Sequence, residues 1–164
     1  MTALGQCYKK TLLKERTMNS APCLNILLVE DDDVDAQFVR RSLKDIKEDI
    51  NLIHCENGAE AVRYLDSINP PKRTQPMLVL LDLNMPEMNG FEFLETIRSK
   101  KHQQNLIIFI LSTSNYWEDK IKTYRYNIAG YLQKRKINQR KNSLSNLIQF
   151  YREYVEFPPD QYEV

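Results

Sequence analysis

The sequence predicts an α/β fold in which a five-stranded parallel sheet is doubly wound and carries helices on both faces. Short apolar runs alternate along the chain with segments whose apolar residues recur at helical spacing. The runs are continuously apolar, which is typical of parallel strands that are buried on both faces. At 164 residues the chain suits one domain, and no internal repeat indicates a second.

Five runs are predicted to be strands, and each is followed by a predicted helix. The strand runs are residues 25–30, 50–55, 77–81, 106–111 and 131–132. The helical stripes span residues 34–46, 61–68, 91–97, 117–128 and 144–155. The stripe that begins at Trp117 continues through Ile121, Tyr124 and Ile128, at spacings of four, three and four residues. Pro70 ends the second helical segment, because proline cannot continue a helix.

The composition excludes several classes of protein. The net charge of +1 gives no general attraction to nucleic acid or to an anionic membrane. Five of the eight residues 134–141 are basic, but no aromatic platform or recognition helix accompanies them, which favours a solvated loop and helix start over a nucleic-acid contact. The longest apolar run, 106–111, is too short to span a membrane. We therefore expect direct binding to neither nucleic acid nor membrane.

The cysteines indicate the redox setting of the protein, and the chain ends indicate the limits of its domain. Three scattered cysteines without CxxC spacing argue against a disulfide framework or a zinc site, and favour a reducing, cytoplasmic setting. Residues 1–23 lack the unbroken apolar stretch of a signal peptide and are predicted to be a weakly ordered leader. Residues 24–156 then form the domain, and residues 157–164 a C-terminal tail.

Charged and polar residues stand where the predicted strands end. Glu30 and Asp31 end the first strand, Asp82 ends the third, Ser112 the fourth and Lys134 the fifth. In parallel sheets of this type, ligands bind at the carboxyl ends of the strands, close to the point where the strand order reverses. If the first and third strands are neighbours, their carboxylates converge and repel one another, and a hard divalent cation such as Mg²⁺ would relieve that repulsion.

A single acidic residue after a strand has a simpler explanation, because it commonly caps the next helix. That explanation is favoured for Asp32 or Asp33 taken alone. Three carboxylates together with a hydroxyl and a lysine, each at the end of a strand, favour a functional site instead.

Four motifs carry a resemblance to a known family. They are VEDD at 29–32, LLDLNMPEMNG at 80–90, LST at 111–113 and GYLQK at 130–134. In this order and spacing they resemble the receiver domain of two-component response regulators. The resemblance covers residues 24–156 and implies a flavodoxin-like sheet with strand order 2-1-3-4-5.

The resemblance also implies a role for each site residue. Asp82 would be the phosphoacceptor, taking a phosphoryl group from a sensor histidine kinase or a phosphotransfer protein. Mg²⁺ would be held by Glu30, Asp31, Asp82 and the backbone carbonyl of Asn84. Lys134 would contact the phosphate, and Ser112 and Tyr131 would form the switch. The protein would promote its own phosphorylation and slow dephosphorylation without being an enzyme that acts on a separate substrate.

The sequence departs from the family pattern beside Lys134. The family usually has proline after this lysine, joined by a cis bond, whereas Arg135 follows here. Because a cis bond without proline costs about 3 kcal/mol, we predict a trans bond. We also predict that the following loop leaves Arg135 and Lys136 in solvent, and that Lys134 still reaches Asp82 through its long stem.

Two further departures concern position 112 and the C-terminus. Ser112 stands where threonine is commoner, which keeps the hydroxyl. The chain ends near the last receiver helix, so no DNA-binding output domain is expected. Residues 69–76 and 151–158 resemble small regulators that are paired with bacterial phytochromes and related sensor kinases, and the resemblance leaves a homodimer open.

Two other functions compete with this interpretation. A haloacid-dehalogenase type of phosphatase would also use Asp82 as nucleophile, but it needs a second aspartate where this chain has Asn84. A receiver-shaped protein could also bind partners without ever taking phosphate. Labelling of Asp82 by acetyl phosphate would separate the three.

Overall fold

We describe a computed structural model of the chain that covers residues 23–44, 46, 50–68, 76–140 and 142–157. Nearly all of the predicted leader, most of the segment 69–76 and the tail beyond residue 157 lie outside the described residues. None of the helices in the described part is long and apolar enough to cross a membrane.

The five predicted strands form one parallel sheet. They are β1 (Leu24–Val29), β2 (Ile50–Cys55), β3 (Met77–Leu81), β4 (Ile107–Ser112) and β5 (Gly130–Gln133). Their order in the sheet is β2-β1-β3-β4-β5, and every neighbouring pair is parallel. The predicted fold class and strand order are therefore confirmed. The order reverses between β1 and β3, which are direct neighbours.

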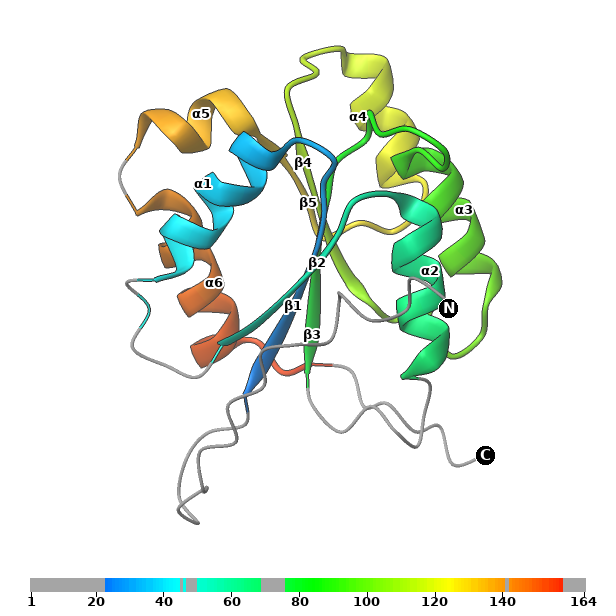
Figure 1. Cartoon of the computed structure of the whole chain (residues 1–164), viewed down its shortest axis with the longest axis horizontal. Helices are drawn as coiled ribbons and strands as arrows, with labels where there is room; N and C mark the ends of the chain where they lie inside the picture. The colour runs from blue at the N-terminus through cyan, green and yellow to red at the C-terminus, as the bar shows by residue number, and fades with distance from the viewer. Residues whose placement is uncertain (1–22, 45, 47–49, 69–75, 141, 158–164) are drawn as a thin grey trace, which may run out of the picture.

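Helices cover both faces of the sheet (Figure 1). They are α1 (Asp33–Leu43), α2 (Gly58–Ser67), α3 (Gly90–Ser99), α4 (Trp117–Tyr124), α5 (Lys134–Gln139) and α6 (Ser143–Tyr154). In Figure 1, α1, α5 and α6 lie on one side of the sheet and α2, α3 and α4 on the other. The arrangement is the doubly wound one that the sequence predicts.

Two hydrophobic cores result, one on each face, because successive strand residues point to opposite faces. Along β1, Ile26 and Leu28 belong to the core beneath α1 and α6. Leu27 and Val29 belong to the core beneath α2 and α3. All four side chains are fully buried, which explains why the strand is continuously apolar.

The start of α3 is held close to the end of β3. The side chain of Asn89 caps this helix by accepting hydrogen bonds from the backbone N–H groups of Phe91 and Glu92, and the Glu92 carboxylate accepts one from the Asn89 N–H. A Cβ on Gly90 would lie 2.5 Å from the carbonyl oxygen of Asp82 and 2.8 Å from Cα of Leu83. Glycine is therefore required where the helix approaches the backbone that carries Asp82.

Two elements differ from the sequence prediction. The helix predicted to run to Ile128 ends at Tyr124, and Asn127 then takes a left-handed conformation before β5. Most of the apolar stripe on α4 faces solvent, with Trp117 64% exposed and Tyr124 52% exposed, while Ile128 is buried beyond the helix end. The short helix α5 is the second difference, because its place was predicted to be mainly a loop.

Candidate functional site

The candidate site lies at the carboxyl edge of the sheet, around the ends of β1 and β3. Glu30 directly follows β1 and Asp82 directly follows β3. The backbone N–H of Asp82 donates to the carbonyl of Val29 at 2.9 Å, so the parallel pairing continues to the point where both carboxylates begin. Both side chains are almost fully buried.

Three carboxylates gather there. Oxygens of Glu30, Asp31 and Asp82 all lie within 4.8 Å of one another, and Asp31 is the exposed member. Unit charges about 4 Å apart repel by roughly 4 kcal/mol at an effective dielectric of 20. Such an oxygen cluster, open to solvent through Asp31, fits a hard divalent cation.

The neighbouring Asp32 has the simpler role that the sequence favours for it. Its carboxylate accepts hydrogen bonds from the backbone N–H groups of Val34 and Asp35, at 2.8 and 3.0 Å. Asp32 is therefore the N-cap of α1. It is not a member of the carboxylate cluster.

Lys134 brings positive charge into the cluster. Its Nζ lies 2.7 Å from Glu30 Oε2, 2.7 Å from Asp35 Oδ2 and 3.0 Å from Asp82 Oδ1. The lysine side chain is only 8% exposed, so these ion pairs are shielded from water. The prediction that Lys134 reaches Asp82 is confirmed.

Burial and charge oppose each other in the pKa values of this site. Burial raises the pKa of Glu30 to about 7, although the Lys134 ammonium acts to lower it. Burial likewise raises the pKa of Asp82, against the lowering effects of Lys134 and of the Asn84 N–H. Burial alone would lower the pKa of Lys134, but its hydrogen bonds with Asp35 and Glu30 and the charge of Asp82 raise the pKa above its ordinary value. The ammonium is thus held in its charged form.

Both oxygens of Asp82 are held in place. Oδ1 faces Lys134, and Oδ2 accepts a hydrogen bond of 2.6 Å from the backbone N–H of Asn84. Asn84 thus lies beside the cluster as predicted, through its N–H group. A metal contact through its carbonyl stays a prediction.

Ser112 and Tyr131 meet through Ser114, in the loop after β4. Ser112 Oγ accepts the Ser114 N–H at 3.1 Å, and the Tyr131 hydroxyl donates to the Ser114 carbonyl at 3.2 Å. The Ser114 hydroxyl in turn donates to Asp119 of α4 at 2.6 Å. No hydrogen bond among the described residues joins Ser112 to Asp82. The two predicted switch residues are therefore linked to each other and to α4.

The chain after Lys134 is helical, which corrects the predicted loop. Helix α5 begins at Lys134 itself, so Lys134 and Arg135 lie in one helical turn. Arg135 and Lys136 are exposed as predicted, while Ile137 packs into the core beneath α1 and α6. A single buried apolar residue leaves no helical periodicity to detect, which is why the sequence did not indicate α5. The trans form of the bond stays a prediction.

Asp35 and Arg98 were not singled out by the sequence. Asp35 pairs with Lys134 from α1, and an acidic residue one helical turn beyond Asp31 is the signal that could have indicated it. Arg98 donates to backbone carbonyls at the far end of the sheet. No sequence motif marks that role.

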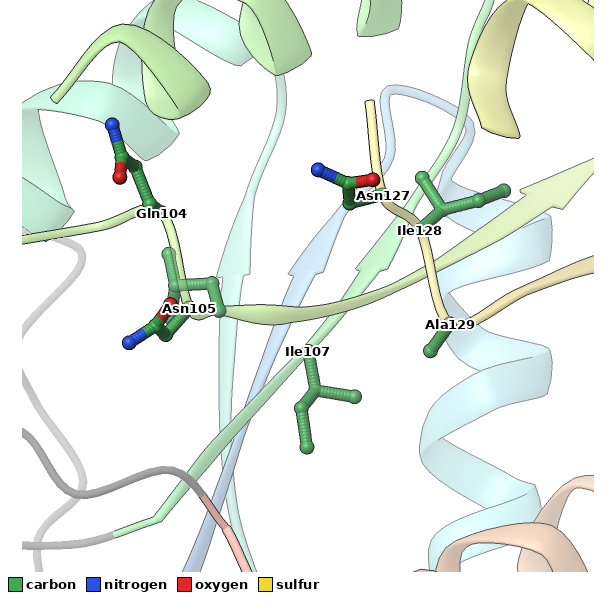
Figure 2. A pocket seen from close by; sticks show the side chains of 7 residues that line it. Gln104, Asn105, Ile107, Asn127, Ile128 and Ala129 are labelled. Atoms are coloured by element: carbon green, nitrogen blue, oxygen red, sulfur yellow. The ribbon is translucent and has the colours of Figure 1, made fainter. Parts of the chain in front are cut away.

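A hollow of about 330 Å³ lies at the opposite edge of the sheet, where β4 begins (Figure 2). It is lined by residues 104–107 and 127–129, all of them amide or apolar side chains. It contains no titratable group. The titratable groups of the candidate site lie instead at the carboxyl edge of the sheet.

Comparison with known proteins assigns the family. A family model described as the response regulator receiver domain matches residues 26–145, which includes every site residue predicted from the sequence. The chain belongs to the response regulator receiver family. Receiver domains receive phosphoryl groups from histidine kinases, and they bind Mg²⁺ or Mn²⁺ at an acidic pocket.

Individual relatives agree with this assignment. The chain is 31% identical over 141 residues to the response regulator Rcp1 of Synechocystis sp., covering 85% of this chain and 96% of Rcp1. It is 32% identical over 118 residues to the nitrate/nitrite response regulator protein NarL of Escherichia coli, covering 71% of this chain but only 50% of NarL. The similarity thus extends over nearly all of Rcp1 and half of NarL.

Two solved structures share the fold of this receiver domain. The Mn²⁺-bound form of Rcp1 has a TM-score of 0.70 at 30% identity, covering 82% of this chain and 99% of that one. The phosphorylated cyanobacterial phytochrome response regulator RcpA has a TM-score of 0.72 at 26% identity, covering 82% and 98%. The first of them is a Mn²⁺-bound form, and the acidic cluster of this chain fits a divalent metal.

Proposed function

We propose that this receiver domain accepts a phosphoryl group on Asp82 from a histidine kinase or a phosphotransfer protein, and that phosphorylation switches a partner-binding surface. One observation carries the proposal. The buried Asp82 carboxylate has the Lys134 ammonium 3.0 Å away on one oxygen and two further carboxylates within 4.8 Å. A nucleophile, a fixed positive charge and a set of metal ligands thus meet at one point.

The chemistry follows from that arrangement. A carboxylate oxygen of Asp82 would attack the phosphorus atom, and the bond from phosphorus to the donor's leaving atom would break, with the electron pair leaving on that atom. Negative charge spreads over the phosphoryl oxygens as this happens, so catalysis depends mainly on positioning and electrostatics. The Lys134 ammonium would stabilise that charge. The Asn84 N–H, which holds Oδ2, would orient the nucleophile.

The residues present fit Mg²⁺ as the cofactor. Hard cations prefer oxygen ligands, and Glu30, Asp31 and Asp82 supply three carboxylates that otherwise repel one another. When bound, the ion would neutralise charge on the transferring phosphoryl group. The ion itself is neither a substrate nor a product, and we propose that the chain has no separate substrate to turn over.

The switch would run through the loop after β4. A phosphoryl oxygen on Asp82 would be a new acceptor for the Ser112 hydroxyl. Rotation of Ser112 toward it would weaken the bond that Ser112 Oγ now accepts from the Ser114 N–H. Because Ser114 also contacts Tyr131 and Asp119, the change would reach β5 and α4.

Incubation with acetyl phosphate and Mg²⁺ tests the assignment of Asp82. We expect wild-type protein to gain the mass of one phosphoryl group. Asp82→Asn should gain none while its circular dichroism spectrum stays that of a folded protein, because asparagine keeps the shape and lacks the anionic nucleophile. Asp33→Asn is the matched control, since it removes one exposed carboxylate from the first turn of α1 and should be phosphorylated normally.

The outcomes separate the competing functions. Equal incorporation in wild-type protein and Asp82→Asn would overturn the assignment. If wild-type protein takes no phosphate but still captures a partner, the chain is a phosphate-independent interaction module. Rapid continuous release of phosphate from small phosphoesters would instead indicate a phosphatase.

The partner kinase is proposed from similarity to RcpA, which is described as a phytochrome response regulator. We propose a phytochrome-type sensor kinase as the donor and the cytoplasm as the site of transfer. Labelled phosphate should pass from such a kinase to this chain faster than it does from sensor kinases of other types. Transfer at equal rates from all types of sensor kinase would contradict the pairing.

A further inference from the structure

Asp35 contacts the lysine of the site from outside the carboxylate cluster. It lies in the first turn of α1, and its Oδ2 accepts a hydrogen bond of 2.7 Å from Lys134 Nζ across 99 positions of sequence. Its side chain is 27% exposed, against 1% for Glu30 and 5% for Asp82. Asp35 is therefore the acceptor on the solvent side of this ammonium.

We propose that Asp35 is a positioning residue that holds the Lys134 ammonium beside Asp82 during phosphoryl transfer. This inference rests on the proposed function of Asp82. Lysine carries its charge on a flexible four-carbon stem, so its position depends on the groups that accept its hydrogen bonds. With Arg135 following it at the start of α5, the stem of Lys134 extends from the first residue of a helix toward the carboxylates.

The three carboxylates that form ion pairs with this ammonium would be affected differently by the reaction. Glu30 and Asp82 belong to the carboxylate cluster that fits a divalent cation, and Asp82 would lose its negative oxygen to the new bond with phosphorus. Asp35 is outside that cluster and forms no bond in the reaction. It can therefore keep its hydrogen bond to Lys134 while the ion pairs of Lys134 with Glu30 and Asp82 change.

The local structure fixes Asp35 for this role. Its own backbone N–H donates to Asp32 Oδ1 at 3.0 Å, within the cap that starts α1. Ala36, in the first turn of α1, is fully buried in the same core as Leu28 of β1, so the helix start cannot shift freely against the strand. A capped and packed first turn presents the Asp35 carboxylate toward Lys134.

The negative charge of Asp35 also has an opposing effect, because it would repel an incoming phosphoryl group. The Lys134 ammonium lies in direct contact with the carboxylate and compensates that charge. Partial exposure of Asp35 screens it further. The positioning effect should therefore dominate, and removal of Asp35 should slow phosphorylation.

The first test compares phosphorylation rates with acetyl phosphate and Mg²⁺. We expect Asp35→Ala to slow the reaction by about tenfold to a hundredfold, because a misplacement of about 1 Å can cost up to about a hundredfold in rate. Asp35→Asn should be slowed less, because its amide oxygen still accepts a hydrogen bond. Asp33→Ala and Asp33→Asn are the matched controls: they remove an equal charge in the same helical turn, and Asp33 has no ion pair among the described residues.

A double-mutant cycle distinguishes positioning from general structural damage. If Asp35 acts through Lys134, Asp35→Ala should slow phosphorylation of the wild-type protein but have no further effect in Lys134→Ala. Equal slowing in both backgrounds would overturn the proposal. So would wild-type rates in both Asp35 variants.

A second readout needs neither metal nor phosphate. In metal-free protein, the Lys134 ammonium should give a resolved ¹⁵N-detected signal, because it is buried and held by its acceptors. Asp35→Ala should broaden or shift this signal, and the Asp33 variants should not. An unchanged signal would overturn the proposal even where the Lys134→Ala rate is too low to measure. Wild-type protein that takes no phosphate would overturn the proposed function, and the ammonium signal would then decide alone whether Asp35 holds Lys134.

Discussion

At the scale of single residues, Glu30 shows how burial conflicts with charge in this site. Its side chain is 1% exposed, and Lys134 compensates only part of the cost of burying its carboxylate. The result is a pKa raised to about 7. Folding in the absence of metal therefore favours the neutral form of Glu30, while metal binding requires the ionised form.

The first prediction concerns the stability of metal-free protein against pH. A raised pKa in the folded state means that Glu30 stabilises the fold fully below its ordinary pKa of 4.5, and that this contribution is lost as the pH rises through about 7. The difference between the ordinary pKa of 4.5 and the raised pKa of about 7 corresponds to a loss on the order of 3 kcal/mol in the free energy of unfolding. Relative to Glu30→Gln, which does not titrate, the free energy of unfolding of wild-type protein should fall by that amount between pH 4.5 and 8.

Urea unfolding in chelator at several pH values measures this difference. Lys134 stays charged across the window, and Asp82 is present in both proteins, so their contributions largely cancel. Glu95→Gln, an exposed residue of α3, is the control and should follow the wild-type curve. A wild-type minus Glu30→Gln difference that does not change with pH would contradict the argument.

At the scale of elements, Arg98 of α3 joins three segments at the far edge of the sheet. Its guanidinium donates to four backbone carbonyls within 3.1 Å. These carbonyls belong to Gln104, Leu106, Tyr126 and Asn127. They lie in the segments that lead into β4 and β5, so one side chain ties α3 to the starts of both strands.

The second prediction is that Arg98→Ala destabilises the domain by about 2–4 kcal/mol, because it leaves several partly buried carbonyls without a donor. Thermal or urea unfolding measures the loss. Arg63→Ala, an exposed position on α2, should change stability by less than about 0.5 kcal/mol.

The rate of phosphorylation of the folded Arg98→Ala protein should stay that of the wild type, because Arg98 lies at the opposite edge of the sheet from Asp82. A large loss of rate without loss of stability would contradict this separation.

At the scale of the whole molecule, the parallel sheet creates the charge repulsion that a cation relieves. The pairing of β1 with β3 places two buried carboxylates side by side, and Asp31 adds a third. Lys134 supplies one positive charge against them and against Asp35. The folded protein should therefore bind a divalent cation more tightly than the unfolded chain does.

The third prediction is that Mg²⁺ raises the stability of the domain. For a dissociation constant near 1 mM, 10 mM Mg²⁺ should add about 1.4 kcal/mol to the free energy of unfolding. The melting temperature should rise by roughly 3–6 °C. Asp31→Asn should lose most of this effect, whereas Asp33→Asn should keep it, and an equal effect in both variants would show that the ion acts elsewhere.

The sequence by itself determined the fold class and most of the site. Continuous apolar runs mark strands that are buried on both faces, and helical stripes mark the segments between them. Residues that directly follow parallel strands must gather at one edge of the sheet, so the sequence alone groups Glu30, Asp82 and Lys134. That reasoning succeeds because topology alone controls which strand ends are neighbours.

Only the tertiary structure decided how the helices are oriented and which distant side chains meet. The apolar stripe of α4 predicted a helix correctly, but periodicity reports a face and does not say whether that face meets the core, and Trp117 is 64% exposed. The contact of Asp35 with Lys134 depends on the rotation of α1 and on the helical start of α5, neither of which leaves a local pattern. The carbonyls that Arg98 binds are likewise brought together only by packing, because backbone groups carry no mark of their partners in the sequence.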